Sequence, residues 1–550
     1  MPISCPHRPT LLALAALLST GARAVDLSPP ESDWSVRFDN TVKTSAIYRL
    51  NSADPALVDS TRLLVPGVPA SAFPQALNLN AGDDNFRNKG WVSKRVDLLS
   101  EFDAVYRKNL GLRVSAAAWY DASYHGTTAA SDAGNGQMPP NAFPDRTRNV
   151  AGRKAEVLDA FVFGGFELDG GRKLTLRAGR HAVVYGESLF FGDNGIAQAQ
   201  GPVDIFKLQS SPNAQFKEIV RPVPQVSAQL QLSPDLSVGG YYQLRWEANR
   251  MPPAGSFFST SNTPWGSRLP EFVNGAVLLA AGEREPSNKG QYGLQVKVRL
   301  DETDLGFYFA RYHDKGGQLY SQLNVTSADP GQYSWLFPAG IRTVGVSATR
   351  SFGDANFAVE ASLRDGMPLT SSNMVYPNVA PEPRFAKGRT AHLNLSWLAS
   401  LGPNFLARES SFVGELAWNR ALSVDDPDHT LDGNRTRDAT ALQFVYSPSY
   451  RQVSSGLDLS VPVGLRYVLD GNSSVTGLGW GPRGTGQATL GIEGNYLGVW
   501  QFTATYAHHI GRAEPFVDYS PLRTGGTPTY TRGNVLADRD NLAFSLRRTF

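Results

Sequence analysis

Charged side chains of both signs gather in one long stretch of the chain, residues 181–222, and in the residue just before it. These carboxylate, guanidinium and ammonium groups could bind ions or set a local field; they are Arg180, His181, Glu187, Asp193, Asp204, Lys207, Lys217, Glu218 and Arg221. If such a stretch crosses a water-filled lumen, its opposed charges produce a transverse field and narrow the path of a solute. The alternative is a solvated cap outside the lumen, and the sequence leaves both positions open.

Motifs for catalysis or metal binding are lacking. The sequence has no G-x-S-x-G, H-E-x-x-H or G-x-x-x-x-G-K-[ST] motif, and no G-x-G-x-x-G follows a predicted strand. His508 and His509 are neighbours in a predicted strand, so they face opposite sides and cannot share one metal ion. The acidic loop 425–438 does not have the spacing of a calcium loop. We therefore predict no enzymatic activity, no metal and no cofactor.

A second set of charges repeats with a period of two, and this period indicates the elements that must position both sets. In residues 34–50, apolar side chains such as Trp34, Val36 and Phe38 alternate with polar ones. Successive side chains of a strand point to opposite faces, so each such stretch has one apolar and one wet side. In the first strands we predict that the wet side lines an aqueous interior with Arg37, Arg95, Asp97, Glu101, Asp103 and Arg113.

The same alternation recurs along the chain and predicts about 18 strands. They are expected near residues 34–50, 95–106, 110–121, 156–168, 172–180, 223–232, 236–247, 290–300, 304–312, 341–352, 355–364, 389–399, 411–420, 438–447, 457–469, 486–496, 499–509 and 539–550.

Short turns and long loops alternate between these strands, and aromatic residues fall near both strand ends. Bilayer hydrocarbon offers no hydrogen-bond partners, so a sheet can reside there only if it closes on itself. The pattern predicts an all-β fold: a transmembrane antiparallel β-barrel, residues 25–550, with short periplasmic turns and long extracellular loops. Residues 181–222 form the third long loop and are the candidate constriction.

The first 24 residues have the features of a signal peptide: His7 and Arg8, an apolar run from Leu11 to Leu18, and small residues at the end. Cys5, the single cysteine of the sequence, lies within this segment. Two of the 52 basic residues, and none of the 50 acidic ones, lie there as well. The mature chain is then close to neutral, which gives no support to nucleic-acid binding.

The chain ends in a strand-like stretch whose last residue, Phe550, shares the apolar parity with Leu542, Phe544 and Leu546. A terminal aromatic on the lipid-facing side resembles the recognition signal that the barrel assembly machinery of Gram-negative bacteria binds. Arg548 departs from that pattern, because an aromatic or apolar residue usually stands there.

Several segments also carry a resemblance: "YGES" (Tyr185–Ser188), "GPVDIFKL" (Gly201–Leu208), and the stretches 90–124, 236–259 and 450–471. With them, nearly all of the mature chain is similar to a family of Gram-negative outer-membrane proteins catalogued only as a domain of unknown function. That family has no established catalytic residues to transfer. The resemblance implies an outer-membrane location and traffic of a lipid, sterol or aromatic solute, with a periplasmic lipid carrier and an inner-membrane exporter as partners.

Two of the predicted loops, 61–79 and 256–282, are more apolar than solvated loops should be. The second has the features of a short helix, with Pro270 in its first turn and Gly282 beyond its end. Such loops could pack on other loops, contact outer-leaflet lipid or surround a hydrophobic ligand. The sequence favours a passive channel for small hydrophobic or aromatic solutes, and the alternative is a non-conducting surface barrel for binding or adhesion.

Overall fold

The computed structural model describes residues 25–28, 32–58, 81–128, 141–260, 268–270, 277–323, 331–371, 375–377, 385–425, 431–476, 480–514, 517–518 and 529–550. The predicted signal peptide and the apolar loop 61–79 lie outside these residues. Within them, no helix has the length and apolar character needed to cross a bilayer.

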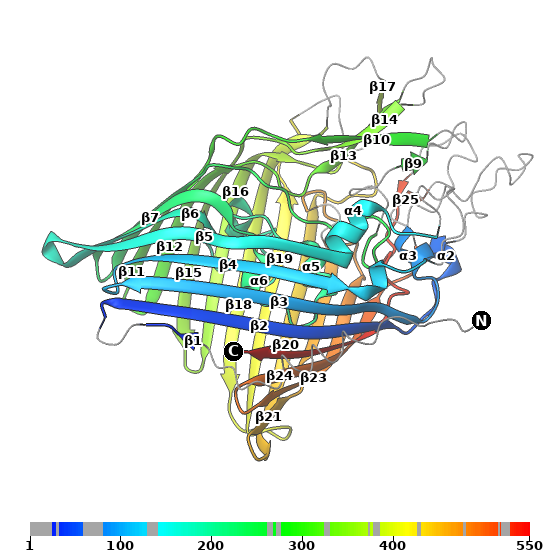
Figure 1. The fold of residues 1–550 in the computed structure, drawn as a ribbon. Helices are drawn as coiled ribbons and strands as arrows, with labels where there is room; N and C mark the ends of the chain where they lie inside the picture. The colour runs from blue at the N-terminus through cyan, green and yellow to red at the C-terminus, as the bar shows by residue number, and fades with distance from the viewer. Residues whose placement is uncertain are drawn as a thin grey trace, which may run out of the picture.

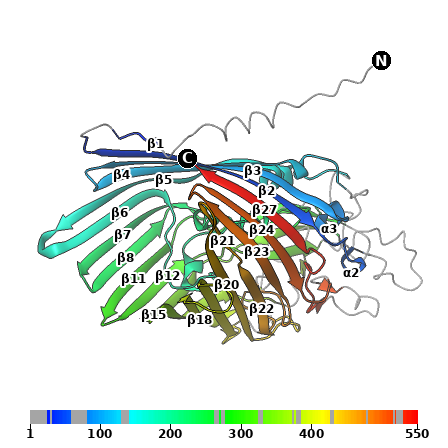
Figure 2. The ribbon, with the colours of Figure 1, turned by 90° about the horizontal axis from the view of Figure 1, so that it is seen from below.

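One large antiparallel sheet curves round and closes on itself (Figures 1 and 2). Its strands are β2 (Trp34–Arg49), β3 (Gly90–Tyr106), β4 (Leu110–Asp121), β5 (Arg153–Leu168), β6 (Arg172–His181), β7 (Val223–Ser233), β8 (Leu236–Gln243), β11 (Gln291–Leu300), β12 (Thr303–Tyr312), β15 (Ile341–Phe352), β16 (Ala355–Pro368), β18 (Lys387–Leu401), β19 (Glu409–Ala421), β20 (Asp438–Ser454), β21 (Leu457–Ser460), β22 (Val463–Gly471), β23 (Gly486–Tyr496), β24 (Trp500–Ile510) and β27 (Asn541–Thr549). Because β21 and β22 occupy one position, interrupted at Val461 and Pro462, the barrel has 18 strands, as predicted.

Both ends of the described chain take part in closing the barrel. β27 pairs with β2 from Arg49 to Thr41, and the backbone of Phe550 exchanges hydrogen bonds of 2.7 and 2.8 Å with that of Asn40. Beyond this point β1 (Val25–Asp26) pairs with β2 opposite Phe38. The early part of β2, which β27 does not reach, thus gains a partner strand, as backbone groups in an apolar surrounding require.

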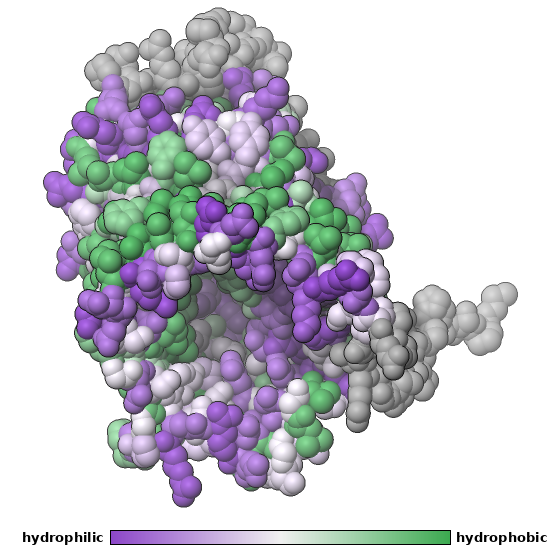
Figure 3. All heavy atoms as spheres, turned by 90° about the vertical axis from the view of Figure 1, so that its left-hand side faces the viewer, coloured by the Kyte–Doolittle hydropathy of each residue, from purple (hydrophilic) through white to green (hydrophobic). Residues whose placement is uncertain are grey.

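The barrel carries its apolar side chains on the outside and its polar ones inside. Leu363 of β16 is 53% exposed on the outer face, whereas the next residue, Arg364, is 2% exposed and faces inward. The same alternation holds on β5, where Val162 is 57% exposed, and on β23, where Leu490 is 52% exposed. A water-soluble sheet protein would bury these side chains, so the outer face is suited to hydrocarbon. Figure 3 views the end with the short turns and shows a hollow bordered largely by hydrophilic residues.

Irregular elements and two small sheets occupy the connections. The helices are short: α2 (Pro55–Val58), α3 (Ala81–Asn85), α4 (Asp145–Thr147), α5 (Ile205–Ser210) and α6 (Phe216–Ile219), with single tighter or wider turns η4 (Ala122–Tyr124), η5 (Arg148–Gly152), η6 (Asp169–Gly171) and η7 (Ile196–Ala199). A five-stranded sheet at the long-loop end contains β9 (Arg268–Pro270), β10 (Val277–Arg284), β13 (Gln318–Leu323), β14 (Gly331–Leu336) and β17 (Val375–Pro377). β25 (Val517–Asp518) pairs with β26 (Thr529–Tyr530).

The helix predicted within residues 256–282 is wrong. Residues 268–270 and 277–284 are strands, and β10 pairs with β9 on one side and with β14 on the other. A short apolar run such as Val277–Ala280 suits a helix or a strand equally well by its pattern alone. The run forms a strand because β14, more than 50 positions away in the sequence, pairs with it and supplies hydrogen-bond partners for the backbone of β10.

Adjacent residues of β23 test which face meets lipid. Leu490→Arg should lower the free energy of unfolding in lipid vesicles by about 2–4 kcal/mol, because it places a guanidinium in hydrocarbon. Thr489→Arg, one residue away on the inner face, should cost much less. Urea titration of the folded protein in vesicles measures both, and equal losses for the two variants would contradict the assignment of the faces.

Candidate functional site: the lumen and its inward segment

Residues 182–222, here called the inward segment, join β6 to β7 and contact inward-facing side chains on opposite sides of the barrel. Lys43 Nζ of β2 donates to Ser211 Oγ at 2.6 Å. Glu360 of β16 accepts from the backbone N–H of Glu187 at 2.6 Å, and Glu415 of β19 accepts from that of Leu189 at 3.0 Å. The segment therefore lies inside the barrel.

Two buried carboxylates hold the first half of the inward segment by its backbone. Glu415 Oε2 accepts hydrogen bonds from three consecutive N–H groups, those of Leu189, Phe190 and Phe191. Glu360 uses both oxygens, one for the N–H of Glu187 and one for that of Ile196. Buried carboxylates are costly unless hydrogen-bonded, and consecutive N–H groups form a concave anion site that satisfies them. Each carboxylate thus fixes an irregular stretch that has no strand partner.

Arg364 and Asn194 complete this attachment. The guanidinium of Arg364 donates to the carbonyl oxygens of residues 193, 194 and 195, with distances of 3.1, 2.5 and 2.9 Å. The Asn194 side chain donates to Asn394 Oδ1 at 2.9 Å and accepts from Asn419 Nδ2 at 3.1 Å. Side chains of β16, β18 and β19 therefore hold the turn at 193–195 by hydrogen bonds, some as donors and some as acceptors.

The second half of the inward segment lies against β3–β5. Asp204 caps α5 by accepting from the N–H of Lys207 at 2.8 Å and forms an ion pair with Arg250 at 2.6 Å. The ring of Trp119 on β4 has three cations over it, with Lys207 Nζ at 4.7 Å, Arg95 at 4.8 Å and Arg250 at 5.7 Å from its centroid. Acidic groups and an aromatic face together offset the mutual repulsion of these cations.

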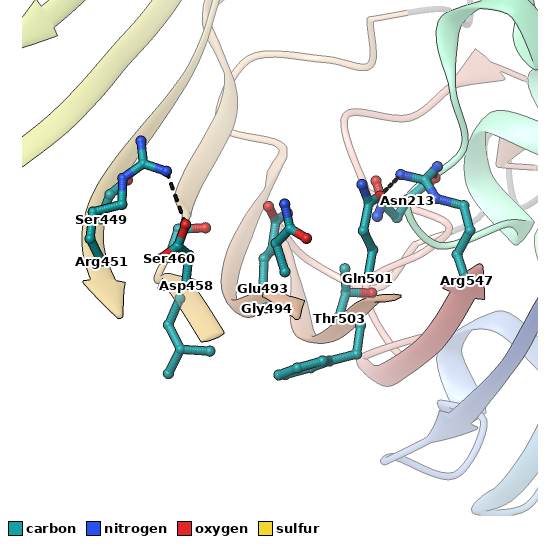
Figure 4. A pocket seen from close by; sticks show the side chains of 13 residues that line it. Asn213, Ser449, Arg451, Asp458, Ser460, Glu493, Gly494, Gln501, Thr503 and Arg547 are labelled. Carbon is teal, nitrogen blue, oxygen red and sulfur yellow. Dashed lines mark hydrogen bonds and ion pairs between the residues drawn. The ribbon is translucent and has the colours of Figure 1, made fainter. Parts of the chain in front are cut away.

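Two polar cavities flank the tip of the inward segment at the short-turn end. One, of about 270 Å³, is lined by Arg37, Asp39, Thr41, Glu101, Asp103, Arg113, Gln215, Lys217 and Thr549. The other, of about 320 Å³, is lined by Asn213 and by residues of β20, β21, β23, β24 and β27 (Figure 4). Here Arg547 Nη1 lies 3.5 Å from the carbonyl oxygen of Asn213, and Arg451 pairs with Asp458 at 3.3 Å.

The structure brings most of the predicted charged residues together in pairs. Lys217 and Arg113 both contact Glu101, and Arg113 also pairs with Asp103 at 3.0 Å. Further pairs are Arg37–Asp39 at 2.6 Å, Arg95–Asp97 at 2.6 Å, Lys207–Glu218 at 3.7 Å, Arg221–Glu247 at 3.0 Å and Glu187–Lys297 at 3.3 Å. Asp193 lies in the turn held by Arg364.

Two residues of the predicted set differ from the rest. Arg180 shares the parity of Leu176 and Ala178, which face outward on β6, and it pairs with Glu247 at 2.7 Å. Glu247 also pairs with Arg221 of the inward segment at 3.0 Å, so Arg180 is linked to that segment through a shared carboxylate, and its position on the constriction stays a prediction. His181 is 1% exposed, donates from Nδ1 to the carbonyl of Gly179 at 3.1 Å and contacts Ser227 Oγ at 2.8 Å, so its hydrogen bonds go to the wall itself.

Sequence reasoning missed a buried ionic network at the long-loop end. Arg49 pairs with Asp83 at 3.0 Å and with Asp538 at 2.7 Å, and Arg539 pairs with Asp83 at 2.9 Å. Both guanidinium groups lie 5.6 Å from the ring centroid of Phe257. Arg49 could have been found from its inward parity on β2, but Asp83, Asp538 and Arg539 belong to connections with no periodic pattern.

Apolar loop residues surround this network. Phe257 and Phe258 are buried with Ile47, Val92 and Phe86. The sequence leaves three positions open for the apolar loop 256–282: on other loops, on lipid or around a ligand. Phe257 and Phe258 pack on the barrel wall and on another loop residue. Among the described residues, no group of three or more His, Cys, Asp or Glu side chains is arranged to hold a metal ion.

Glu415→Ala tests the attachment of the inward segment. Loss of the carboxylate leaves the N–H groups of residues 189–191 without their acceptor, and hydrogen exchange at these amides should accelerate by about tenfold or more. Glu409→Ala on the same strand is the matched control, because Glu409 pairs with Arg451 at the exposed rim. Exchange that is unchanged in Glu415→Ala would contradict the described attachment.

Lys315, in the connection after β12, gives a pH-dependent test. Burial lowers the pKa of its amino group to about 8, and Nζ donates to the carbonyl oxygens of Gln198 and Ala199 at 3.4 and 3.3 Å. Because the unfolded chain holds this proton more tightly, stability should rise as pH increases from about 8 towards the ordinary lysine pKa, and Lys315 should cause no change well below 8, where both states hold the proton. Thermal unfolding at several pH values measures the rise, and Lys315→Met should flatten it. An identical profile in the variant would exclude Lys315 as its source.

Similar solved structures include OccAB3 of Acinetobacter baumannii, with 11% identity, a TM-score of 0.41 and coverage of 94% of this chain and 99% of that chain. OccAB1 of the same organism has 10% identity, a TM-score of 0.41 and coverage of 94% and 96%. The outer-membrane channel DcaP of Acinetobacter baumannii has 9% identity, a TM-score of 0.36 and coverage of 96% of this chain and 100% of that chain.

No curated protein matches the sequence. Residues 7–550 match the model of a family described as "Protein of unknown function (DUF1302)", as the resemblance implied. The chain therefore belongs to this family.

Proposed function

We propose that the protein is a channel of the Gram-negative outer membrane that passes small solutes passively, with the inward segment as its constriction. The observation that carries the proposal is the closed barrel with an apolar outside and a polar inside, crossed by residues 182–222. An apolar outer face requires lipid, and a wet interior offers a path through it. Long loops would then face the exterior and short turns the periplasm. The proposal includes no catalytic step and no cofactor.

The path would run along one side of the lumen. The inward segment contacts β2, β3, β16, β18 and β19 through polar side chains, and Phe191 packs on Ala439, Ala441 and Val468 of β20 and β22. The larger cavity lies by contrast against β20, β21, β23, β24 and β27, where inward residues are mainly hydroxyl and amide side chains: Ser449, Ser460, Asn495, Gln501 and Thr503. Both signs of charge line the two cavities, which supports weak ion preference.

We also propose that the solutes are hydrophobic or aromatic. This rests on the family resemblance, which implies lipid- or sterol-like traffic, and extends to a periplasmic lipid carrier and an inner-membrane exporter as partners. Phe550 pairs with Asn40 through its backbone, so its side chain is presented at the closing strand pair. There it would serve the barrel assembly machinery as a terminal signal.

Removal of the constriction tests the channel. Replacing residues 185–218 by a short Gly-Ser linker should raise the single-channel conductance in planar bilayers by about twofold or more, because an emptied barrel of this strand number leaves an aqueous channel. Glu302→Ala, in the exposed short turn after β11, is the control and should conduct like the unaltered protein.

The alternative function, a non-conducting barrel, predicts a different current recording in the planar bilayer. A bilayer that stays silent with both the unaltered and the shortened protein would contradict the channel and favour a non-conducting barrel for binding or adhesion. Equal conductance of the two proteins would instead contradict the constriction.

A further inference from the structure

In two ion pairs of the smaller cavity the acid lies against the wall and the base faces the lumen, whereas Arg113 and Asp103 are almost equally exposed, at 28% and 27%. The side chain of Arg37 is 63% exposed, whereas its partner Asp39 is 10% exposed. Lys217 is 44% exposed and its partner Glu101 is 8% exposed. Although the formal charges balance, a solute in the lumen meets the guanidinium of Arg37 and the ammonium of Lys217 before the carboxylates that pair with them.

The ion pairs of Arg37 and Lys217 leave other N–H donors of these two side chains available to a ligand. Arg37 contacts Asp39 through Nε, and a guanidinium carries five N–H donors in total. Lys217 contacts Glu101 through an ammonium group that has three. A carboxylate ligand can therefore accept from both side chains while each retains its ion pair, and the hydrogen bonds would be charge-assisted.

The helix that supplies Lys217 also carries an exposed apolar side chain. Phe216 is 66% exposed and stands between Gln215 and Lys217, which both line the cavity. Because α6 lies within the barrel, an exposed side chain there faces lumen water and not lipid. Leu208 of α5, on the same segment, is 52% exposed. A large apolar side chain held in a polar lumen is costly unless a solute covers it.

We propose that the cavity bounded by Arg37, Arg113 and Lys217, together with Phe216, is a binding site for amphiphilic organic anions. The carboxylate of such a solute contacts the cations, and its aromatic or aliphatic body covers Phe216. Phe216 and Lys217 are consecutive residues of α6, so a small aromatic acid bound at Lys217 has Phe216 as its neighbour along the segment. The cavity volume of about 270 Å³ suits a solute of that size. This inference rests on the proposed channel and names the class of its substrate.

Single-channel recording in potassium chloride tests the site with three probes: benzoate, acetate and benzylammonium. Acetate lacks the apolar body and benzylammonium has the opposite charge. Benzoate should interrupt the current at concentrations about tenfold lower than either, because it alone uses both the cations and Phe216.

Variants separate the two contacts. Phe216→Ala should raise the benzoate concentration needed by about fivefold and leave the acetate response unchanged. Lys217→Gln should weaken the response to both anions. Gln209→Ala changes an exposed polar residue of the same segment and is the matched control. All variants should retain the compact, heat-sensitive migration of a folded barrel on gels.

The outcomes are distinguishable. Equal interruption by benzoate and acetate, or Phe216→Ala behaving like Gln209→Ala, overturns the anion site while the channel stands. A protein that passes no ions at all overturns both the channel and the site.

Discussion

The structure depends on one constraint: every backbone hydrogen bond at the apolar face must be made within the sheet. An open sheet would leave two edges with unpaired N–H and C=O groups in hydrocarbon. Closure by β27 on β2 removes most of these edges, but β27 is shorter than β2. The short β1 strand and the backbone of Phe550 continue the pairing along β2. Residues near both ends of the described chain are thus needed to complete the wall.

Inside the barrel the backbone need not be part of the sheet. Irregular backbone is tolerated in the polar lumen if side chains or water supply hydrogen-bond partners. The inward segment obtains these partners from side chains of the strands. Glu360, Glu415 and Arg364 are buried charges that hydrogen-bond to its backbone groups. Charged inner residues therefore have two roles: those at mid-barrel fix the segment, whereas those near the short turns, such as Arg37 and Lys217, face the remaining space. The same fixation leaves Phe216 exposed to the lumen.

The strands could be predicted from the sequence because period-two alternation is a local property, and all 18 are present, although β3 begins five residues before its predicted start and β20 ends seven residues after its predicted end. The site could be predicted only in part. The parity of β3 and β4 identified Arg95, Asp97, Glu101, Asp103 and Arg113 as inward, but Lys217, which pairs with Glu101, comes from the inward segment more than 100 positions away. The turn at Asn194 is bound by residues some 200 positions away, which no local pattern encodes. Arg180 belongs to β6, yet its partner Glu247 also pairs with Arg221 of the inward segment, a link that no local pattern predicts.

The central claim is that the apolar parity meets lipid and the polar parity meets water. Spin labels at two neighbouring residues of β24, Ala504 and Thr505, test it most directly in lipid vesicles, because the first pairs opposite outward Phe544 and the second faces the lumen. We expect the label at residue 504 to be relaxed mainly by oxygen dissolved in the bilayer and that at residue 505 mainly by a water-soluble nickel complex. The opposite pattern, or a folded particle that stays monomeric in water without detergent, would contradict the account.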